Sequence, residues 1–315
     1  MWVSFLLRRG AALVATIIVA SAVVFLAVSL TPGDPAVLLS GTTRPSAEQL
    51  SAVRAEYHLD EPIWVRYGLW LQGILGGDIG RSFVYNISVG DLVGPRLETS
   101  LLLVLYAAIL IIVVGVGTGI WGALRPRAGR SIVVGSAIAM GAPTFVMATL
   151  LSWVFATQLG WFPVYGAGSG FSDMLWHLTL PAVSLSLAYI AYVSRITRTA
   201  VVGEMDAEHV QTAVVRGIPS RLIVQRHVLR NAAAPITTVT GITIAGLLAA
   251  AVVVEQAFGL DGIGSLLVAS AAAKDIPVVQ AIVLGIVILF ALMTTAVDIL
   301  NASLDPRLRT VGARR

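Results

Sequence analysis

The sequence contains no cysteine and only one lysine among its 315 residues. Without cysteine the chain can form no disulfide, thiolate metal site or cysteine nucleophile. The lysine, Lys274, lies in AAAKD, whereas a phosphate-binding P-loop requires G-x-x-x-x-G-K-[ST] so that backbone amides and the lysine hold the phosphates together. The chain therefore cannot carry that motif, and if ATP drives this protein, another chain binds the nucleotide. The four histidines show no paired ligand spacing such as H-x-x-x-H.

Charge is also scarce, because 12% of the residues are charged and 57% are apolar. An ordinary soluble domain is about one quarter charged. Several apolar blocks exceed the roughly 18 to 20 residues that cross a bilayer. We therefore predict an all-α polytopic membrane protein that spans the lipid bilayer with six transmembrane helices. The predicted spans cover residues 1–30, 99–124, 132–158, 177–193, 232–254 and 277–300.

The first of these spans resembles a secretory signal, because Arg8 and Arg9 precede an apolar run and Ala20-Ser21-Ala22 mimics a cleavage site. The apolar run continues to Leu30, which is long enough to cross a membrane. We expect an uncleaved N-terminal transmembrane helix over residues 1–30, with its amino end inside.

The region of residues 31–98 is expected to be extracytoplasmic and to contain two short helices, over 46–59 and 62–75. In the second, Trp64, Tyr67 and Trp70 recur at helical spacing. Because Trp and Tyr favour the membrane–water interface, this pattern predicts an amphipathic helix at the membrane surface.

The basic residues are distributed unevenly between the two sides. With the amino end inside, the four cytoplasmic segments hold 15 of the 21 basic residues. The positive-inside rule therefore predicts cytoplasmic amino and carboxyl termini, and the arginines need no nucleic-acid partner. The span interiors hold almost no charge, and we expect Glu255 and Asp298 to be interfacial at span ends. This scarcity argues against an ion-coupled secondary transporter, which would place polar groups at the midplane.

Three other patterns have a structural and a functional interpretation. The G-x-G-x-x-G from Gly117 to Gly122 would need a preceding strand to bind a dinucleotide, but it lies in a predicted span, where Gly115 and Gly119 favour close helix packing. Pro143 should kink the third span, either as a bending point or as plain structure. Ser169 and His177 could suggest an intramembrane hydrolase, but they lie in or beside a predicted outside loop that does not orient a base.

The long polar stretch 204–235 between the fourth and fifth spans is predicted to be cytoplasmic. A helix there would carry a polar face and an apolar stripe and would end at Gly217, and Pro219 would open a second helix that leads into the fifth span. The pattern alone leaves both a solvated loop and an interaction element open. The predicted polar face is Glu204, Glu208 and Gln211, and the stripe is Ala207, Val210 and Val214.

This stretch resembles a known loop. Gln211-Thr212-Ala213 followed by Gly217 resembles the E-A-A-x-x-x-G loop of permease subunits of ABC importers, with Gln and Thr in place of Glu and Ala. Six segments along almost the whole chain are similar, in the same order, to the peptide and nickel permease family, in particular to the B-type permease of dipeptide transport systems. They are TPGDPA, LDEPIWVRYGLWL, GGDIGRSF, HVQTAVVRGIPSRLIVQRHVLRNAAAP, VVVEQAFGLDGIG and LDPRLR.

The resemblance implies a type I ABC importer permease fold, with a five-helix core over 99–315, a coupling loop at about 199–231 and a cytoplasmic tail over 301–315. In that family a coupling helix docks on a cytoplasmic ATPase, and closure of two ATP-binding cassette subunits on ATP and Mg moves the membrane helices. The contact and the turn would be formed by Glu208, Gln211, Thr212, Ala213, Arg216 and Gly217. Gln211 lacks the usual carboxylate, and we expect Glu208 to replace it.

The same resemblance implies partners and a location. The partners would be a second homologous permease subunit, the two ATPase subunits and an extracytoplasmic substrate-binding protein, in the inner (plasma) membrane of a bacterium. The substrate would be a di- or oligopeptide, with nickel or glutathione as the alternatives. No cofactor is expected in this chain itself.

Overall fold

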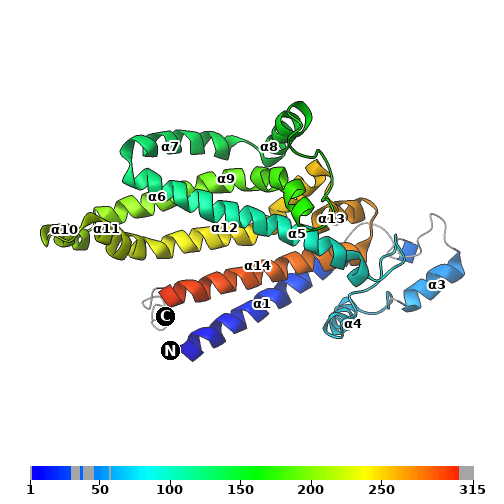
Figure 1. Ribbon diagram of the computed structural model, residues 1–315. Helices are drawn as coiled ribbons and strands as arrows, with labels where there is room; N and C mark the ends of the chain where they lie inside the picture. The colour runs from blue at the N-terminus through cyan, green and yellow to red at the C-terminus, as the bar shows by residue number, and fades with distance from the viewer. Residues whose placement is uncertain (1, 30–35, 38–45, 57, 305–315) are drawn as a thin grey trace.

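The computed structural model describes residues 2–29, 36–37, 46–56 and 58–304 (Figure 1). Within these residues the chain folds into helices, and the only strand-like contact is an isolated bridge between Arg81 and Ser88. The predicted all-α class is confirmed. The TPGDPA turn and the LDPRLR tail both lie mostly outside the described residues.

The helices are α1 (Trp2–Ser29), α3 (Ala47–Glu56), α4 (Ile63–Leu75), α5 (Val89–Leu110), η1 (Ile111–Val116), α6 (Gly117–Leu124), α7 (Pro126–Gly141), α8 (Thr144–Leu151), η2 (Ser152–Gln158), α9 (Phe171–Met205), α10 (Glu208–Val215), α11 (Ser220–Ile223), η3 (Val224–Val228), α12 (Leu229–Phe258), α13 (Ile263–Ala272) and α14 (Ile276–Leu304).

Five helical segments of the described chain are long and apolar enough to cross a membrane. A sixth span results if α7 and the α8–η2 segment, which meet at 99°, cross as one broken span. On that count the prediction of six spans is confirmed. The five segments are Val3–Ala27, Val89–Leu124, Phe171–Met205, Ser220–Phe258 and Ile276–Ser303.

The helices of two predicted spans extend beyond the predicted bounds. The helix of the second span begins at Val89 rather than Thr99, because the Ser88 hydroxyl accepts a hydrogen bond from the Gly90 amide (3.2 Å) and caps the helix earlier. The helix of the fourth span begins at Phe171 and does not stop at its arginines, since α9 continues without a break to Met205. Charged residues near a helix end are compatible with a helix that extends beyond the lipid.

The third span shows more than the kink expected at Pro143. Helix α7 ends at Gly141, Ala142 has the extended angles φ −87° and ψ 122°, and α8 starts after Pro143. Proline has no amide hydrogen, and its ring disfavours the helical conformation of the residue before it. The predicted kink is therefore a complete break, with a bend of 99°.

Helices α5–α6, α9 and α12 form the centre of the molecule, and α1 lies beside α14 (Figure 1). Buried apolar side chains of α5, α9 and α12 form the largest core cluster. Helices α3, α4 and α13 lie at one end of the bundle. Helices α10 and α11 lie at the other end, which is also the end of α1 where the chain begins (Figure 1).

Helix α4 is held against the first span by aromatic side chains. Tyr67 and Trp70 each have ring centroids 5.5 Å from that of Phe25 on α1, and the Tyr67 hydroxyl is 2.7 Å from the Ser21 hydroxyl. Trp64 is 73% exposed on another side of α4. The aromatic residues thus divide between a contact with α1 and an outward face, and their position at a membrane surface stays a prediction.

The glycines in the second span pack against α9. A Cβ atom on Gly119 would lie 2.5 Å from the Thr197 Cβ and 2.7 Å from the Ser194 carbonyl oxygen, and one on Gly115 would lie 3.3 Å from the Ile190 carbonyl oxygen. The G-x-G-x-x-G pattern lies inside a continuous helical segment. The prediction of close helix packing is confirmed.

We predict that Gly119→Ala destabilises the protein by about 1–3 kcal/mol, because the added methyl group overlaps Thr197 in a filled contact. Gly117→Ala is the matched control, since its Cβ would meet no atom within 4 Å and alanine favours a helix over glycine. Thermal unfolding of both variants in detergent measures the difference. Equal midpoints for Gly119→Ala and the wild type would contradict the packing argument.

Candidate functional site

Helix α10 (Glu208–Val215) lies between α9 and α11 at the end of the bundle (Figure 1). It ends as predicted, because Gly217 has φ +69° and the Ile218 amide donates a hydrogen bond to the Ala213 carbonyl oxygen (3.2 Å). Glycine adopts this left-handed conformation without the steric cost that a side chain brings. The short α11 follows and continues through η3 into α12, which confirms the predicted second helix leading into the fifth span.

The inner face of α10 is formed by Val210 and Ala213, which are 5% and 4% exposed. They belong to a buried cluster with residues of α9, α11, η3 and α12, namely Val201, Ile223, Val228, Ala232 and Ile236. This small core joins α10 to four other elements, two of which are the long helices α9 and α12. Ala213 lies on the buried face of α10, and its small side chain lets α10 approach α9 and α12.

The outer end of α10 exposes two apolar side chains. Val214 is 60% exposed and Val215 is 87% exposed. Val214 was predicted to share an apolar stripe with Ala207 and Val210, but its side chain is exposed and points away from the buried face formed by Val210 and Ala213. Sequence reasoning missed Val215 altogether. A valine beyond the stripe, directly before a polar turn, was the available signal.

The remaining predicted site residues lie on the same exposed side. Glu208, Gln211, Thr212, Arg216 and Gly217 are all exposed. The structure therefore brings together five of the six predicted residues on one surface, beside Val214 and Val215, and places Ala213 beneath it. This surface of seven residues is called the α10 surface below.

The side-chain amide of Gln211 makes a hydrogen bond within the turn before α10. Its Nε2 donates a hydrogen bond to the Asp206 carbonyl oxygen (3.1 Å), across the turn between α9 and α10. A glutamate at this position could not donate that bond when ionised. The Thr212 hydroxyl donates to the Glu208 main-chain carbonyl oxygen (3.0 Å), and the Glu208 side chain is exposed.

The predicted polar face of Glu204, Glu208 and Gln211 does not lie on one helix. Glu204 belongs to α9, which ends at Met205, whereas Glu208 opens α10. His209, which sequence reasoning did not select, connects the pieces, because its Nε2 lies 3.6 Å from the Glu204 carboxylate and 3.0 Å from the Asn231 side-chain amide. The 3.0 Å contact with Asn231 joins α10 to α12, and it places the His209 ring beside Glu204 of α9.

Glu255 was expected to be interfacial, but its side chain is fully buried inside the protein near the end of α12. The Ser100 hydroxyl of α5 donates to its Oε1 (2.6 Å), and the amides of Gly264 and Ser265 donate to its Oε2 (2.8 and 3.0 Å). Ser100 also accepts a hydrogen bond from the Ile263 amide (2.9 Å). The carboxylate therefore fixes the start of α13 between α12 and α5.

A second buried carboxylate fixes the other end of α13. Asp275 is 0% exposed and accepts a hydrogen bond from the Ser82 hydroxyl (2.5 Å) and one from the Phe83 amide (3.2 Å). Asp298 behaves differently, because it is partly exposed on α14 and pairs with Arg9 of α1. None of these carboxylates belongs to a group of three or more potential metal ligands among the described residues.

The hydrolase alternative finds no support in the geometry of its two residues. The Ser169 amide donates to the Asp173 carboxylate (2.7 Å), and the His177 Nδ1 lies 2.9 Å from the Asp173 carbonyl oxygen. Among the described residues, no hydrogen bond joins the Ser169 hydroxyl to His177. The Ser169 backbone and the His177 side chain thus each contact Asp173, and the serine hydroxyl is not oriented toward a base.

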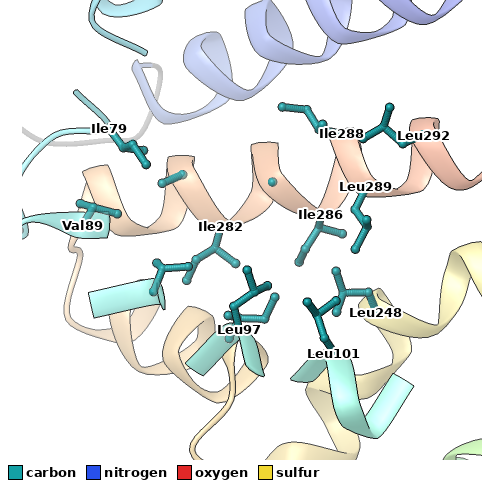
Figure 2. Close-up of a pocket in the computed structure, with 14 residues that line it drawn as sticks. Ile79, Val89, Leu97, Leu101, Leu248, Ile282, Ile286, Ile288, Leu289 and Leu292 are labelled. Atoms are coloured by element: carbon teal, nitrogen blue, oxygen red, sulfur yellow. The ribbon is translucent and has the colours of Figure 1, made fainter. Parts of the chain in front are cut away.

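A cavity of about 360 Å³ lies between α5, α12, α13 and α14 (Figure 2). Leu97 and Leu101 face Ile282 and Ile286 across it, and Leu248 closes one side (Figure 2). Every residue that lines the cavity is apolar or glycine. It therefore offers no group for the charged ends of a peptide, and we do not assign it to the transported molecule.

The fold and the α10 surface define a polytopic helical membrane protein with a short, exposed helix at one end. The family described as binding-protein-dependent transport system inner membrane component matches residues 111–310, and its N-terminal companion family matches residues 2–102. The chain belongs to this family, and its fold is that of a type I importer permease. It is a transporter subunit rather than an enzyme, in a family that works with ATPase and substrate-binding partners, and a multi-pass protein of the inner membrane.

Curated relatives match the chain over nearly its full length. A probable peptide ABC transporter permease protein of Sinorhizobium fredii is 34% identical over 97% of this chain and 99% of its own length. A putative peptide transport system permease protein of Brucella melitensis is 35% identical over 98% of this chain and 99% of its own. A glutathione transport system permease protein of Salmonella choleraesuis is 32% identical over 97% and 99%.

We predict that Ser100→Ala destabilises the protein by roughly 2–3 kcal/mol, because it leaves a buried carboxylate oxygen and the Ile263 amide without a partner. Ser186→Ala is the matched control, since Ser186 is equally buried and its hydroxyl bonds only to the Val183 carbonyl oxygen of its own helix (3.2 Å). Thermal unfolding in detergent compares the two. The argument fails if the two variants unfold at the same temperature.

Proposed function

We propose that this chain forms half of the translocation pathway of an ATP-driven importer of di- or oligopeptides. The observation that supports it most directly is the α10 surface, where two exposed valines stand among polar residues on a helix that is anchored to α9 and α12. Exposed apolar side chains rimmed by polar ones mark protein interaction sites. The relatives described as peptide permeases support the substrate class. Glutathione is an alternative because another relative is described as a glutathione permease, and nickel is an alternative from the sequence resemblance alone.

In this proposal a cytoplasmic ATPase subunit docks on the α10 surface. ATP and Mg are bound by two such subunits, because this chain has no P-loop. A second, homologous permease completes the pathway, and an extracytoplasmic binding protein delivers the peptide. Both termini and α10 would lie in the cytoplasm, which agrees with the arginine excess on that side.

The buried cluster under α10 gives the proposal its mechanical step. When the ATPase subunits close, they would displace α10, and the packing of Val210 and Ala213 would carry α9 and α12 with it. Tightly packed interiors transmit displacement because they leave little space to absorb it. Gln211 would stabilise the bend between α9 and α10, and Glu208 would remain free for a contact with the ATPase.

We expect Val215→Asp to reduce co-purification of the ATPase subunits at least tenfold, because docking would bury an unpaired charge. Leu75→Asp, at the opposite end of the helical bundle, is the control. The two side chains are similarly exposed, Leu75 at 81% and Val215 at 87%. The control should retain the ATPase subunits. Retention of the ATPase by Val215→Asp would exclude the α10 surface as the contact.

Gly217→Asp should instead leave the complex assembled and uncouple ATP hydrolysis from uptake. Aspartate at φ +69° costs about 1 kcal/mol or more, so the turn that orients α10 would relax. ATPase activity and uptake are measured in proteoliposomes with the binding protein present. A normal ratio of transport to hydrolysis in this variant would contradict the coupling role.

The substrate class is tested by uptake of a radiolabelled dipeptide in cells with and without this gene. We expect uptake to disappear on deletion and to return with the wild-type gene. Excess unlabelled glutathione and nickel are the competitors. Uptake of nickel or glutathione that depends on the gene, with unchanged dipeptide uptake, would overturn the peptide assignment but would leave the α10 surface untouched.

A further inference from the structure

A second concave surface lies at the turn between α6 and α7. A hollow of about 470 Å³ is lined by Trp121, Arg125, Arg127 and Ala128. Trp121 is in the last two turns of α6, and Arg125 lies between the two helices. These four residues are called the arginine pocket below, and Arg130 follows about one turn further along α7. The coupling mechanism uses none of them.

The arginine pocket carries concentrated and unbalanced positive charge. Between residues 99 and 172 the sequence has three charged residues, and all are the arginines of this turn, Arg125, Arg127 and Arg130. All three are exposed, and the first turn of α7 contains no acidic residue. Among the described residues, no ion pair or hydrogen bond of these three guanidinium groups is found, whereas Arg96 pairs with Asp261 at 2.8 Å.

The turn that presents these arginines is rigidly packed from behind. A Cβ atom on Gly129 would lie 2.5 Å from the Gly122 carbonyl oxygen and 2.8 Å from Nε of Arg198. That Nε donates a hydrogen bond to the same Gly122 carbonyl oxygen (3.3 Å). A fourth guanidinium group therefore lies behind the turn, and the close approach of α6 and α7 fixes the spacing of the arginines in front.

The position of the turn relates it to the membrane surface. Helix α6 ends an apolar span, and Trp121, which is 57% exposed, precedes Arg125 by one helical turn. Exposed tryptophan is favoured at the level of the lipid headgroups. In Figure 1, α10 and α11 extend beyond this turn at the same end of the molecule. A partner seated on α10 would therefore lie farther from the membrane than the arginine pocket.

We propose that the arginine pocket binds the phosphate headgroup of an anionic phospholipid of the surrounding bilayer. Guanidinium groups match phosphate oxygens with paired donors, and basic pockets beside membrane helices bind anionic headgroups. Arginines that only orient the chain in the membrane need charge, but they need neither a concave site nor a tryptophan at its edge. The inference goes beyond the transport function and does not depend on its substrate.

The test uses the full-length chain purified with its partner subunits. Native mass spectrometry measures the binding of dioleoylphosphatidylglycerol, with dioleoylphosphatidylcholine as the neutral lipid and inorganic phosphate as the free anion. Arg125→Gln/Arg127→Gln is the test variant. Arg221→Gln, which removes an exposed arginine from α11 outside the pocket, is the charge control.

We expect the wild type and Arg221→Gln to bind phosphatidylglycerol equally and in preference to phosphatidylcholine. The double variant should bind it roughly 30-fold more weakly, at about fivefold for each arginine near the surface. Inorganic phosphate at the same concentration should not displace the lipid. If the double variant unfolds, Trp121→Phe replaces it. This variant should bind phosphatidylglycerol several-fold more weakly and bind phosphatidylcholine as the wild type does.

Three results would overturn the proposal. Equal phosphatidylglycerol binding by the double variant and the control would show that the pocket holds no lipid. Displacement by inorganic phosphate would assign the site to a soluble anion. Loss of the ATPase subunits from the double variant, with lipid binding unchanged, would assign the arginines to a protein contact instead.

Discussion

Helix α9 passes α6 at a distance that only glycine permits, and much of the molecule depends on that approach. With Gly119 against Thr197 and Ser194, the two helices have no space for a side chain between them. The contact brings Arg198 of α9 within reach of the Gly122 carbonyl oxygen, so the turn to α7 is held in place. The contact lies about two turns before the end of α9 from which α10 follows. The α10 surface and the arginine pocket thus lie at the same end of the bundle as this glycine contact.

The opposite end relies on buried carboxylates. Glu255 and Asp275 flank α13, and each accepts one serine hydroxyl and at least one backbone amide from another segment. In an apolar environment such groups are tolerated only when hydrogen-bonded, so each carboxylate specifies one arrangement of its neighbours. Gly262 and Gly264 have no side chain where the Glu255 carboxylate lies, since a Cβ on either would approach it within 3 Å. The short α13 is therefore fixed at both ends by polar contacts rather than by its apolar surface alone.

Much of this architecture could be predicted because its physical signals are local. Apolar length indicated the spans, Gly217 and Pro219 marked the turn after α10, and the glycine spacing indicated close helix packing in the second span. The errors arose where a distant partner decides the outcome. Glu255 looked interfacial because its acceptor role depends on Ser100, far away in the chain. Val214 looked buried because a helical stripe does not show which of two adjacent faces another helix covers.

The site shows the same division between local and distant information. The identity of the α10 residues was predictable, but the inward position of Ala213 depends on Val201, Ile223 and Val228, which come from three other elements. The arginine pocket depends likewise on the return of α7 toward α6. Its arginines were recognised in the sequence only as a measure of orientation. Their grouping around a hollow requires the fold.

Helix α9 has 35 residues, with one internal proline at Pro181. At about 1.5 Å per residue it extends for roughly 50 Å, well beyond a hydrocarbon layer of about 30 Å. The close contact with α6 lies near one end of this rod, at Ser194 and Thr197, so about 23 residues precede it and about 8 follow it. If α9 tilts about that contact in the proposed transport cycle, the two arms would move by unequal amounts. A tilt of 5° would move the end next to α10 by about 1 Å and the opposite end by about 3 Å, so a small push in the aqueous phase would give a larger displacement on the far side of the bilayer.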